Sequence, residues 1–260
     1  MRKNNYIYIL ILLMPFIDLA SSLSNRVSPD IISLGIVVKS FIILLSIFYI
    51  IFISKSKYRR ISIIYLLMIF AYIALYFLFK NDLLDIYIIK QEMNYLFKFI
   101  YFPVLFFGLL NYFDNNGFEK NKMNNVMISS FIAYILIIAI PTIFKINFGS
   151  YVNSEYFGSV GWFYSANEIS TILLLMFPFI YTLLSSHKII TFIIFMFGLY
   201  ATSLVGTKVT LFGIIIVTTL LFICGLLKSK KISKNNIIMF LMCVVTIVFM
   251  TNNYSAMNLR

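Results

Sequence analysis

Charged residues are scarce in this chain. Asp, Glu, Lys and Arg make up 12% of its 260 residues, whereas 62% are hydrophobic. A soluble protein of this length exposes roughly half of its positions to water, and this composition has too few polar side chains for that. Its apolar runs instead match the ~20 residues that a helix needs to cross the hydrocarbon core of a bilayer. The sequence therefore predicts an integral membrane protein.

Cysteines and acidic residues are also few. The places of the cysteines and of the basic residues each exclude a class of protein. The two cysteines, Cys224 and Cys243, lie inside apolar runs, which argues against a disulfide framework. Only nine residues are acidic against 21 basic ones. The basic residues lie in short loops between apolar runs and form no groove with interleaved aromatic residues. This distribution excludes nucleic-acid binding and is typical of a membrane topology.

Continuous apolar segments predict an all-α, polytopic transmembrane bundle of about nine spans. The runs do not alternate in polarity, so each is expected to be a helix that satisfies its own backbone hydrogen bonds. We expect one integral membrane domain over residues 1–260. The segments are residues 6–23, 31–53, 61–79, 93–113, 126–145, 167–184, 189–205, 209–227 and 237–251.

The basic residues also predict the orientation. With the N-terminus in the cytoplasm, thirteen Lys and Arg residues fall on the inner side, seven fall on the outer side, and Lys39 lies within a span. Cytoplasmic loops carry such an excess. The inner residues are Arg2, Lys3, Lys55, Lys57, Arg59, Arg60, Lys120, Lys122, Lys188, Lys228, Lys230, Lys231 and Lys234. The sequence thus predicts a cytoplasmic N-terminus and an extracellular C-terminus, with membrane lipids around the spans.

Three ionisable residues fall within the predicted spans, where a charge is costly and is a functional candidate. Asp18 in the first span and Lys39 in the second lie at similar depth, roughly 8–12 Å below the outer surface at 1.5 Å per residue. Lys98 lies near the outer end of the fourth span. Two interpretations stay open. Either Asp18 and Lys39 form a structural ion pair and Lys98 extends to the surface, or the two lysines bind substrate.

The stretch GWFYSANEIS (residues 161–170) places a polar cluster directly before an apolar segment. Ser165 and Glu168 have the S-x-x-E spacing of a capping box, and Trp162 fits an aromatic belt at the membrane surface. The same geometry also supports a functional interpretation. A helix that begins at the outer surface favours an anion there, to which Asn167 donates, while Glu168 either acts as a base or positions a hydroxyl.

A second stretch, SLVGTKVTLF (residues 203–212), predicts a tight outer turn with Gly206 in the turn and Lys208 at the next helix start. A lysine at this end of a helix opposes the helix dipole, unless an anion lies between them. The alternative is a solvated loop lysine. Together with Lys39, Lys98 and the start of the sixth span, Lys208 belongs to the outer half of the membrane. This arrangement suits a lipid diphosphate.

These stretches resemble a known family. GWFYSANEISTILLLMFPF and LVGTKVTLFG are similar to consecutive motifs of the O-antigen ligase/polymerase superfamily, particularly of its Gram-positive members. MPFIDLASSL, SLGIVVKSFIILL and KFIYFPVLF are similar to its early Asp- and Lys-bearing spans. The matches follow the family's order over most of the chain.

The resemblance implies a GT-C-like fold in the bacterial plasma membrane. It also implies transfer or polymerisation of glycans from an undecaprenyl-diphosphate carrier at the outer leaflet, in polysaccharide biosynthesis, without metal or nucleotide cofactors. The positions of the polar residues in the sequence predict Glu168 and Lys208 as catalytic groups, with Lys39, Lys98, Trp162 and Asn167 on the substrate.

The family's pattern differs from this sequence at the C-terminal end. Family members extend beyond the point where this chain ends, with a large outer loop that often carries a catalytic histidine. The single histidine here, His187, falls on the predicted inner side, so we expect the N-terminal portion of such a protein.

The alternative functions are a transporter or flippase of lipid-linked sugars and a structural membrane subunit. A transporter predicts pseudo-symmetric halves, and the sequence shows no internal repeat.

Overall fold

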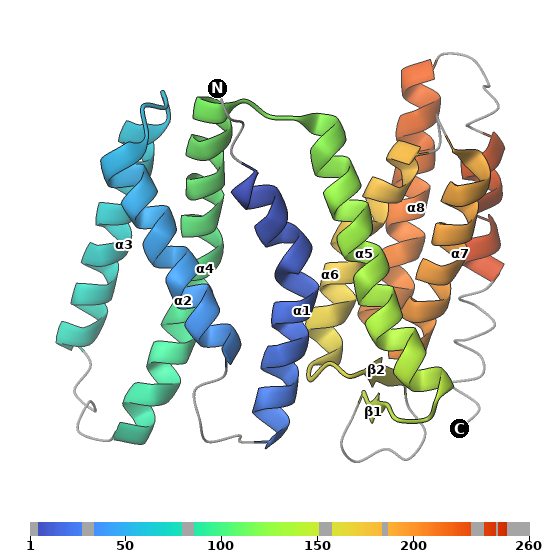
Figure 1. Cartoon of the computed structure of the whole chain (residues 1–260), viewed down its shortest axis with the longest axis horizontal. Helices are drawn as coiled ribbons and strands as arrows, with labels where there is room; N and C mark the ends of the chain where they lie inside the picture. The colour runs from blue at the N-terminus through green and yellow to red at the C-terminus, as the bar shows by residue number, and fades with distance from the viewer. Residues whose placement is uncertain are drawn as a thin grey trace. The chain divides into compact units, whose positions relative to one another are not determined.

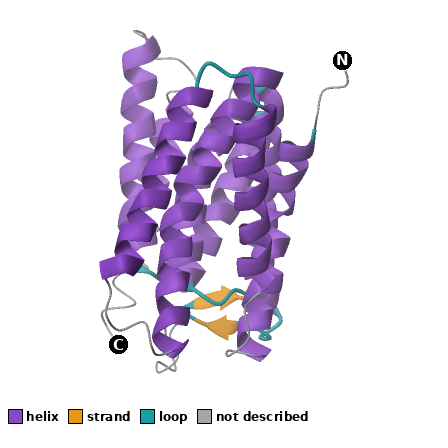
Figure 2. Cartoon of the chain, turned by 90° about the vertical axis from the view of Figure 1, so that its left-hand side faces the viewer, coloured by secondary structure: helices purple, strands orange, loops and turns teal. Residues whose placement is uncertain are grey.

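The computed structural model describes residues 5–27, 34–79, 86–150, 158–183, 187–229, 237–242 and 244–248. Within these ranges the chain is almost entirely helical, with two short strands (Figure 2). A helix is present in each of the nine segments that the sequence predicts. The all-α class of the fold is therefore confirmed.

Contacts between residues divide the chain into two units. Unit 1 comprises residues 1–4 and 32–119, and unit 2 comprises residues 5–31 and 120–260. The first predicted span thus packs with the second half of the chain rather than with its neighbours in sequence.

Unit 1 is built from four helical segments (Figure 1). They are α2 (Leu34–Phe48), the π-helix η1 (Tyr49–Ile53), α3 (Arg59–Phe79) and α4 (Ile86–Asn116). Its core is aliphatic and consists of Ile43, Ile50, Leu66, Ile69 and Val104. α4 begins seven residues before the predicted span 93–113 because residues 86–102 contain no glycine or proline that would interrupt a helix.

Unit 2 contains the remaining elements. They are α1 (Tyr6–Val27), α5 (Lys120–Ile143), β1 (Phe148–Gly149), β2 (Ser159–Gly161), α6 (Ala166–Ile180), the 3₁₀ turn η2 (Tyr181–Leu183), α7 (Lys188–Val205) and α8 (Lys208–Ser229). Residues 237–242 and 244–248 are also helical. Phe131, Phe177 and Phe195 are fully buried, and the ring of Phe177 contacts those of Phe131 and Phe195 edge to face, at 5.6 and 5.5 Å between centroids.

The two strands form an antiparallel pair at one end of unit 2, between the predicted spans 126–145 and 167–184 (Figure 1). Gly161 has a φ of 62°, and a side chain there would overlap the backbone of Ile137 and Ile138 on α5. Gly158 has a φ of 74° and lies equally close to the backbone of Val205 on α7. Both glycines are needed because this conformation and this approach suit only a residue without a side chain.

Several described helices have the length and composition of membrane spans. Five meet both conditions: Tyr6–Val27, Gly35–Ile53, Arg59–Phe79, Lys120–Ile143 and Lys188–Val205. Ala166–Ile180, Phe212–Leu227 and Ile237–Val248 are shorter apolar helices. Large apolar side chains point outward, such as Leu67 at 62% and Leu175 at 68% exposed. These features fit a polytopic membrane protein, whereas the number of spans and the orientation stay predictions.

Candidate functional site

The beginnings of α6 and α8 lie side by side at the end of unit 2 that carries the two strands (Figure 1). The hydroxyls of Ser170 in α6 and Thr207 before α8 are 2.6 Å apart and fully enclosed. α7 ends at Gly206, whose left-handed φ of 68° lets the chain turn directly into α8. Two helix N-termini therefore meet at one surface, and each adds a partial positive charge to it.

Polar side chains at these two helix starts face outward. Asn167 and Glu168 lie in the first turn of α6, Lys208 is the first residue of α8, and all three are exposed. Ser165 caps α6 because its hydroxyl accepts the backbone N–H of Glu168 at 3.4 Å. The cap accounts for the serine, and the amide, carboxylate and ammonium groups are exposed at the surface.

The aromatic residues before α6 fix its starting point. Phe163 is 1% exposed, and its ring lies 5.6 Å from that of Tyr134 on α5. Trp162 packs against the core with partial exposure and donates its indole N–H to the carbonyl of Ile146 at 3.2 Å. Its N–H group is thus used within the protein, and part of its ring stays exposed.

Arg26 is a residue whose importance the sequence analysis missed. From the last turn of α1 its Nη2 donates to the carbonyl of Phe163 at 2.8 Å. Its guanidinium lies 3.8 Å above the ring of Phe148 and 5.3 Å from that of Tyr164. Arg26 therefore joins α1, β1 and the segment before α6 through a hydrogen bond and cation–π contacts. In the sequence, Arg26 is one of the seven basic residues that fall on the predicted outer side.

The intramembrane charges lie in different units. Asp18 in unit 2 accepts a hydrogen bond of 2.6 Å from the hydroxyl of Tyr134, a side chain that is 2% exposed. Lys39 in unit 1 has its ammonium 5.9 Å from the ring centroid of Tyr101. The ion pair between Asp18 and Lys39 stays a prediction. Lys98 lies on α4, and its side chain falls outside the described residues.

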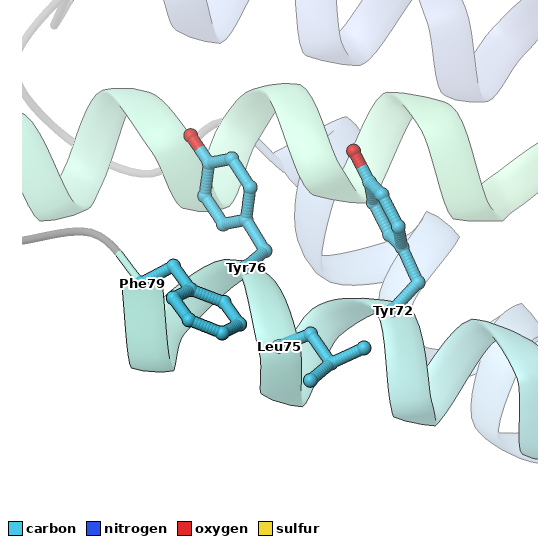
Figure 3. A pocket seen from close by; sticks show the side chains of 4 residues that line it. All are labelled: Tyr72, Leu75, Tyr76 and Phe79. Atoms are coloured by element: carbon cyan, nitrogen blue, oxygen red, sulfur yellow. The ribbon is translucent and has the colours of Figure 1, made fainter.

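Unit 1 also has a hollow on the surface of α3. It has a volume of about 410 Å³ and is lined by Tyr72, Leu75, Tyr76 and Phe79. Figure 3 shows the two tyrosine rings projecting from α3 with their hydroxyls toward the neighbouring helix, and Tyr72 contacts Phe99 of α4 at 5.9 Å. The hollow contains none of the predicted site residues.

The chemistry of the end of unit 2 suits an anion. It combines the N-termini of two helices with an amide and an ammonium group, and the carboxylate of Glu168 lies in the first turn of α6. Within the described ranges, no three His, Cys, Asp or Glu side chains come together to hold a metal ion. The site is therefore defined by hydrogen-bond donors and one acid.

A comparison with protein families identifies the chain's relatives. The model of the family described as O-antigen ligase like membrane proteins matches residues 2–258, which is nearly the whole chain. No curated protein and no solved structure matches the chain. The match extends over every element described above and agrees with the motifs quoted from the sequence, so the chain belongs to the O-antigen ligase like membrane protein family.

Proposed function

We propose that this protein transfers or polymerises glycans from an undecaprenyl-diphosphate carrier at the outer leaflet of the bacterial plasma membrane. The observation that carries the proposal is the meeting of the α6 and α8 starts, which are joined through Ser170 and Thr207. A diphosphate is the group that two adjacent helix starts and a lysine favour together. Family membership supports the same chemistry.

The proposed roles follow from the charges. Lys208 and the first N–H groups of α6 and α8 bind the carrier diphosphate and stabilise the charge that develops on it as it leaves. Asn167 donates a further hydrogen bond. Glu168 removes the proton of the acceptor hydroxyl while that oxygen forms a bond to the sugar carbon and the bond to the diphosphate breaks. The products are the extended glycan and the free carrier diphosphate.

The remaining predicted residues take supporting roles in the proposal. Lys39 and Lys98 belong to unit 1, and their role in substrate binding stays a prediction. The exposed part of the Trp162 ring contacts the sugar. Arg26 holds the segment that precedes α6 through its bond to Phe163.

The test is a transfer assay with the full chain in liposomes. A short-chain undecaprenyl-diphosphate glycan is supplied alone, to detect polymerisation, or with a second glycan acceptor, to detect ligation. Lys208→Ala and Glu168→Gln are expected to lower the rate of glycan transfer. Lys188→Ala is the matched control, because Lys188 is likewise the exposed first residue of a helix but lies at the start of α7.

Two outcomes contradict the proposal. If the glycan crosses the bilayer without being lengthened or transferred, the protein is a transporter. If Lys188→Ala lowers the transfer rate as much as Lys208→Ala, the loss reflects a general effect of charge and the site at α6 and α8 is wrong.

A further inference from the structure

The turn between η1 and α3 is held by a network of buried polar side chains in unit 1. Ser54 and Ser56 are 1% and 8% exposed. Ser54 donates to the side-chain oxygen of Asn111 at 2.8 Å, and Asn111, itself fully buried, donates to Ser62 at 2.7 Å. The turn is thereby joined to both α4 and α3, and its conformation is fixed from inside the unit.

A carboxylate on α4 completes this support. Asp114 accepts the hydroxyl of Ser56 at 2.8 Å and the backbone N–H of Lys57 at 3.1 Å with the same oxygen. The hydroxyl of Ser56 also accepts the backbone N–H of Tyr58 at 3.0 Å. Hydrogen bonds to a charged acceptor are stronger than those between neutral groups. Asp114 therefore fixes the backbone of the basic residues rather than only balancing their charge.

The basic side chains of this segment are mostly exposed, in contrast to the buried serines. Lys55, Lys57 and Arg60 are exposed, whereas Ser54 and Ser56 alternate with the two lysines and are buried. The fourth basic residue, Arg59, is directed inward, where its Nη2 donates to the carbonyl of Ile51 in η1. Three exposed cationic side chains thus lie on the turn and at the adjoining start of α3.

The position of this turn places it at a membrane surface. It connects two helices that have the length and composition of spans, Gly35–Ile53 and Arg59–Phe79. A connection of five residues between two spans cannot leave the headgroup region, since an extended residue covers only ~3.3–3.6 Å. Phosphate groups of lipids are therefore the anions that these side chains meet first.

We propose that the η1–α3 turn is a binding site for the headgroup of an anionic phospholipid, formed by Lys55, Lys57 and Arg60. The three cations bind the lipid phosphate, and the fixed turn removes much of the ordering cost of assembling them around it. Basic side chains next to a span attract anionic lipids in this way. This site is independent of the glycan chemistry proposed for unit 2.

A role in membrane insertion alone does not account for the turn. Insertion requires only that positive charge remain on one side of the membrane. It does not require two buried serines, a buried asparagine and a carboxylate to fix the backbone of the charged residues. The hydrogen-bonded support is what a binding site needs in addition.

The test compares thermal unfolding of the full chain in phosphatidylcholine nanodiscs with and without phosphatidylglycerol. The native chain is expected to unfold at a higher temperature when phosphatidylglycerol is present. The triple variant Lys55→Gln, Lys57→Gln, Arg60→Gln is expected to lose this rise. Because each variant is compared with itself in two lipids, a change in its intrinsic stability does not affect the result. A rise that persists in the triple variant overturns the proposal.

Two controls separate a fixed site from general electrostatics. The variant Lys120→Gln, Lys145→Gln, Lys188→Gln removes the same charge from other exposed positions and is expected to retain the rise. Asp114→Asn makes the chain more positive, so charge alone predicts a larger rise, whereas loss of the support predicts a smaller one. A control triple without the rise, or a larger rise in Asp114→Asn, contradicts the proposal.

A final arm distinguishes a lipid headgroup from a soluble anion. Inorganic phosphate added to phosphatidylcholine nanodiscs is expected to leave the unfolding temperature of the native chain unchanged. An equal rise with inorganic phosphate assigns the turn to a soluble anion and overturns the lipid proposal.

Discussion

Replacing Gly161 with alanine tests how the strand pair positions the start of α6. Gly161 has a φ of 62°, a region that costs a residue with a side chain about 1–2 kcal/mol. The new methyl group would also lie 2.5 Å from the Cα atom of Ile138, a backbone atom that cannot rotate away. Overpacking of this kind costs about 1–3 kcal/mol. The expected loss in the free energy of unfolding is therefore about 2–5 kcal/mol.

Gly117 provides a matched control for this substitution. Its φ is 82°, but no atom lies within 4 Å of the position that a side chain would occupy. Gly117→Ala therefore carries only the conformational cost of about 1–2 kcal/mol. The difference between the two variants measures the contact between β2 and α5 rather than the left-handed backbone.

Unfolding in detergent, followed by circular dichroism, gives the loss for both variants. In Gly161→Ala the fluorescence of Trp162, the single tryptophan of the chain, reports the adjacent segment directly. We expect the fluorescence transition to occur under milder conditions than in the native chain. Equal losses in Gly161→Ala and Gly117→Ala would refute the close approach of the strand pair to α5.

Three further predictions concern the charges and the topology. Tyr134→Phe removes the donor to Asp18 and is expected to cost about 1.5–3 kcal/mol in a denaturation assay, because the acceptor is a carboxylate; an unchanged free energy of unfolding speaks against this bond. If Asp18 and Lys39 form an ion pair, Asp18→Asn leaves the charge of Lys39 unpaired, whereas the double variant Asp18→Asn, Lys39→Met removes both charges. The single variant is therefore expected to be less thermally stable than the double variant. A double variant no more stable than the single one shows that the pair is not direct. A cysteine at position 57, in a background without native cysteines, is expected to react with a membrane-impermeant thiol reagent only from the cytoplasmic side. Labelling of this cysteine from outside would contradict the predicted orientation.

The helices could be predicted from the sequence because each apolar run is long and continuous. Their ends were harder to place. α4 begins at Ile86, well before the apolar run at residue 93, because no glycine or proline interrupts the helix in the polar residues that precede the run. Hydropathy locates the part of a helix that lies in the bilayer, and it does not report where the backbone stops being helical.

The strand pair could not be predicted, because its strands have two and three residues. Alternation of polarity needs at least four residues to become visible. Gly158 and Gly161 were the one available signal, since two glycines close together favour a left-handed or closely packed backbone. The sequence does not show that their partners are α5 and α7.

The candidate site was predicted in part. The capping role of Ser165 follows from its spacing to Glu168, and the turn at Gly206 follows from glycine chemistry. The contact between Arg26 and Phe163 joins residues 137 positions apart, and no local pattern links them. The same is true of Tyr134 and Asp18. Partners across helices depend on which helices are neighbours, and that is decided by packing.

The central claim is that the starts of α6 and α8 bind the carrier diphosphate, and the affinity of purified protein for a short-chain undecaprenyl-diphosphate sugar tests it most directly. Lys208→Ala is expected to weaken binding by about 1–3 kcal/mol, or roughly 5- to 150-fold, the range for losing a charged hydrogen bond. Raised salt is expected to weaken binding of the native chain as well. Lys188→Ala is expected to bind like the native chain. Unchanged affinity in Lys208→Ala would contradict the account of this site.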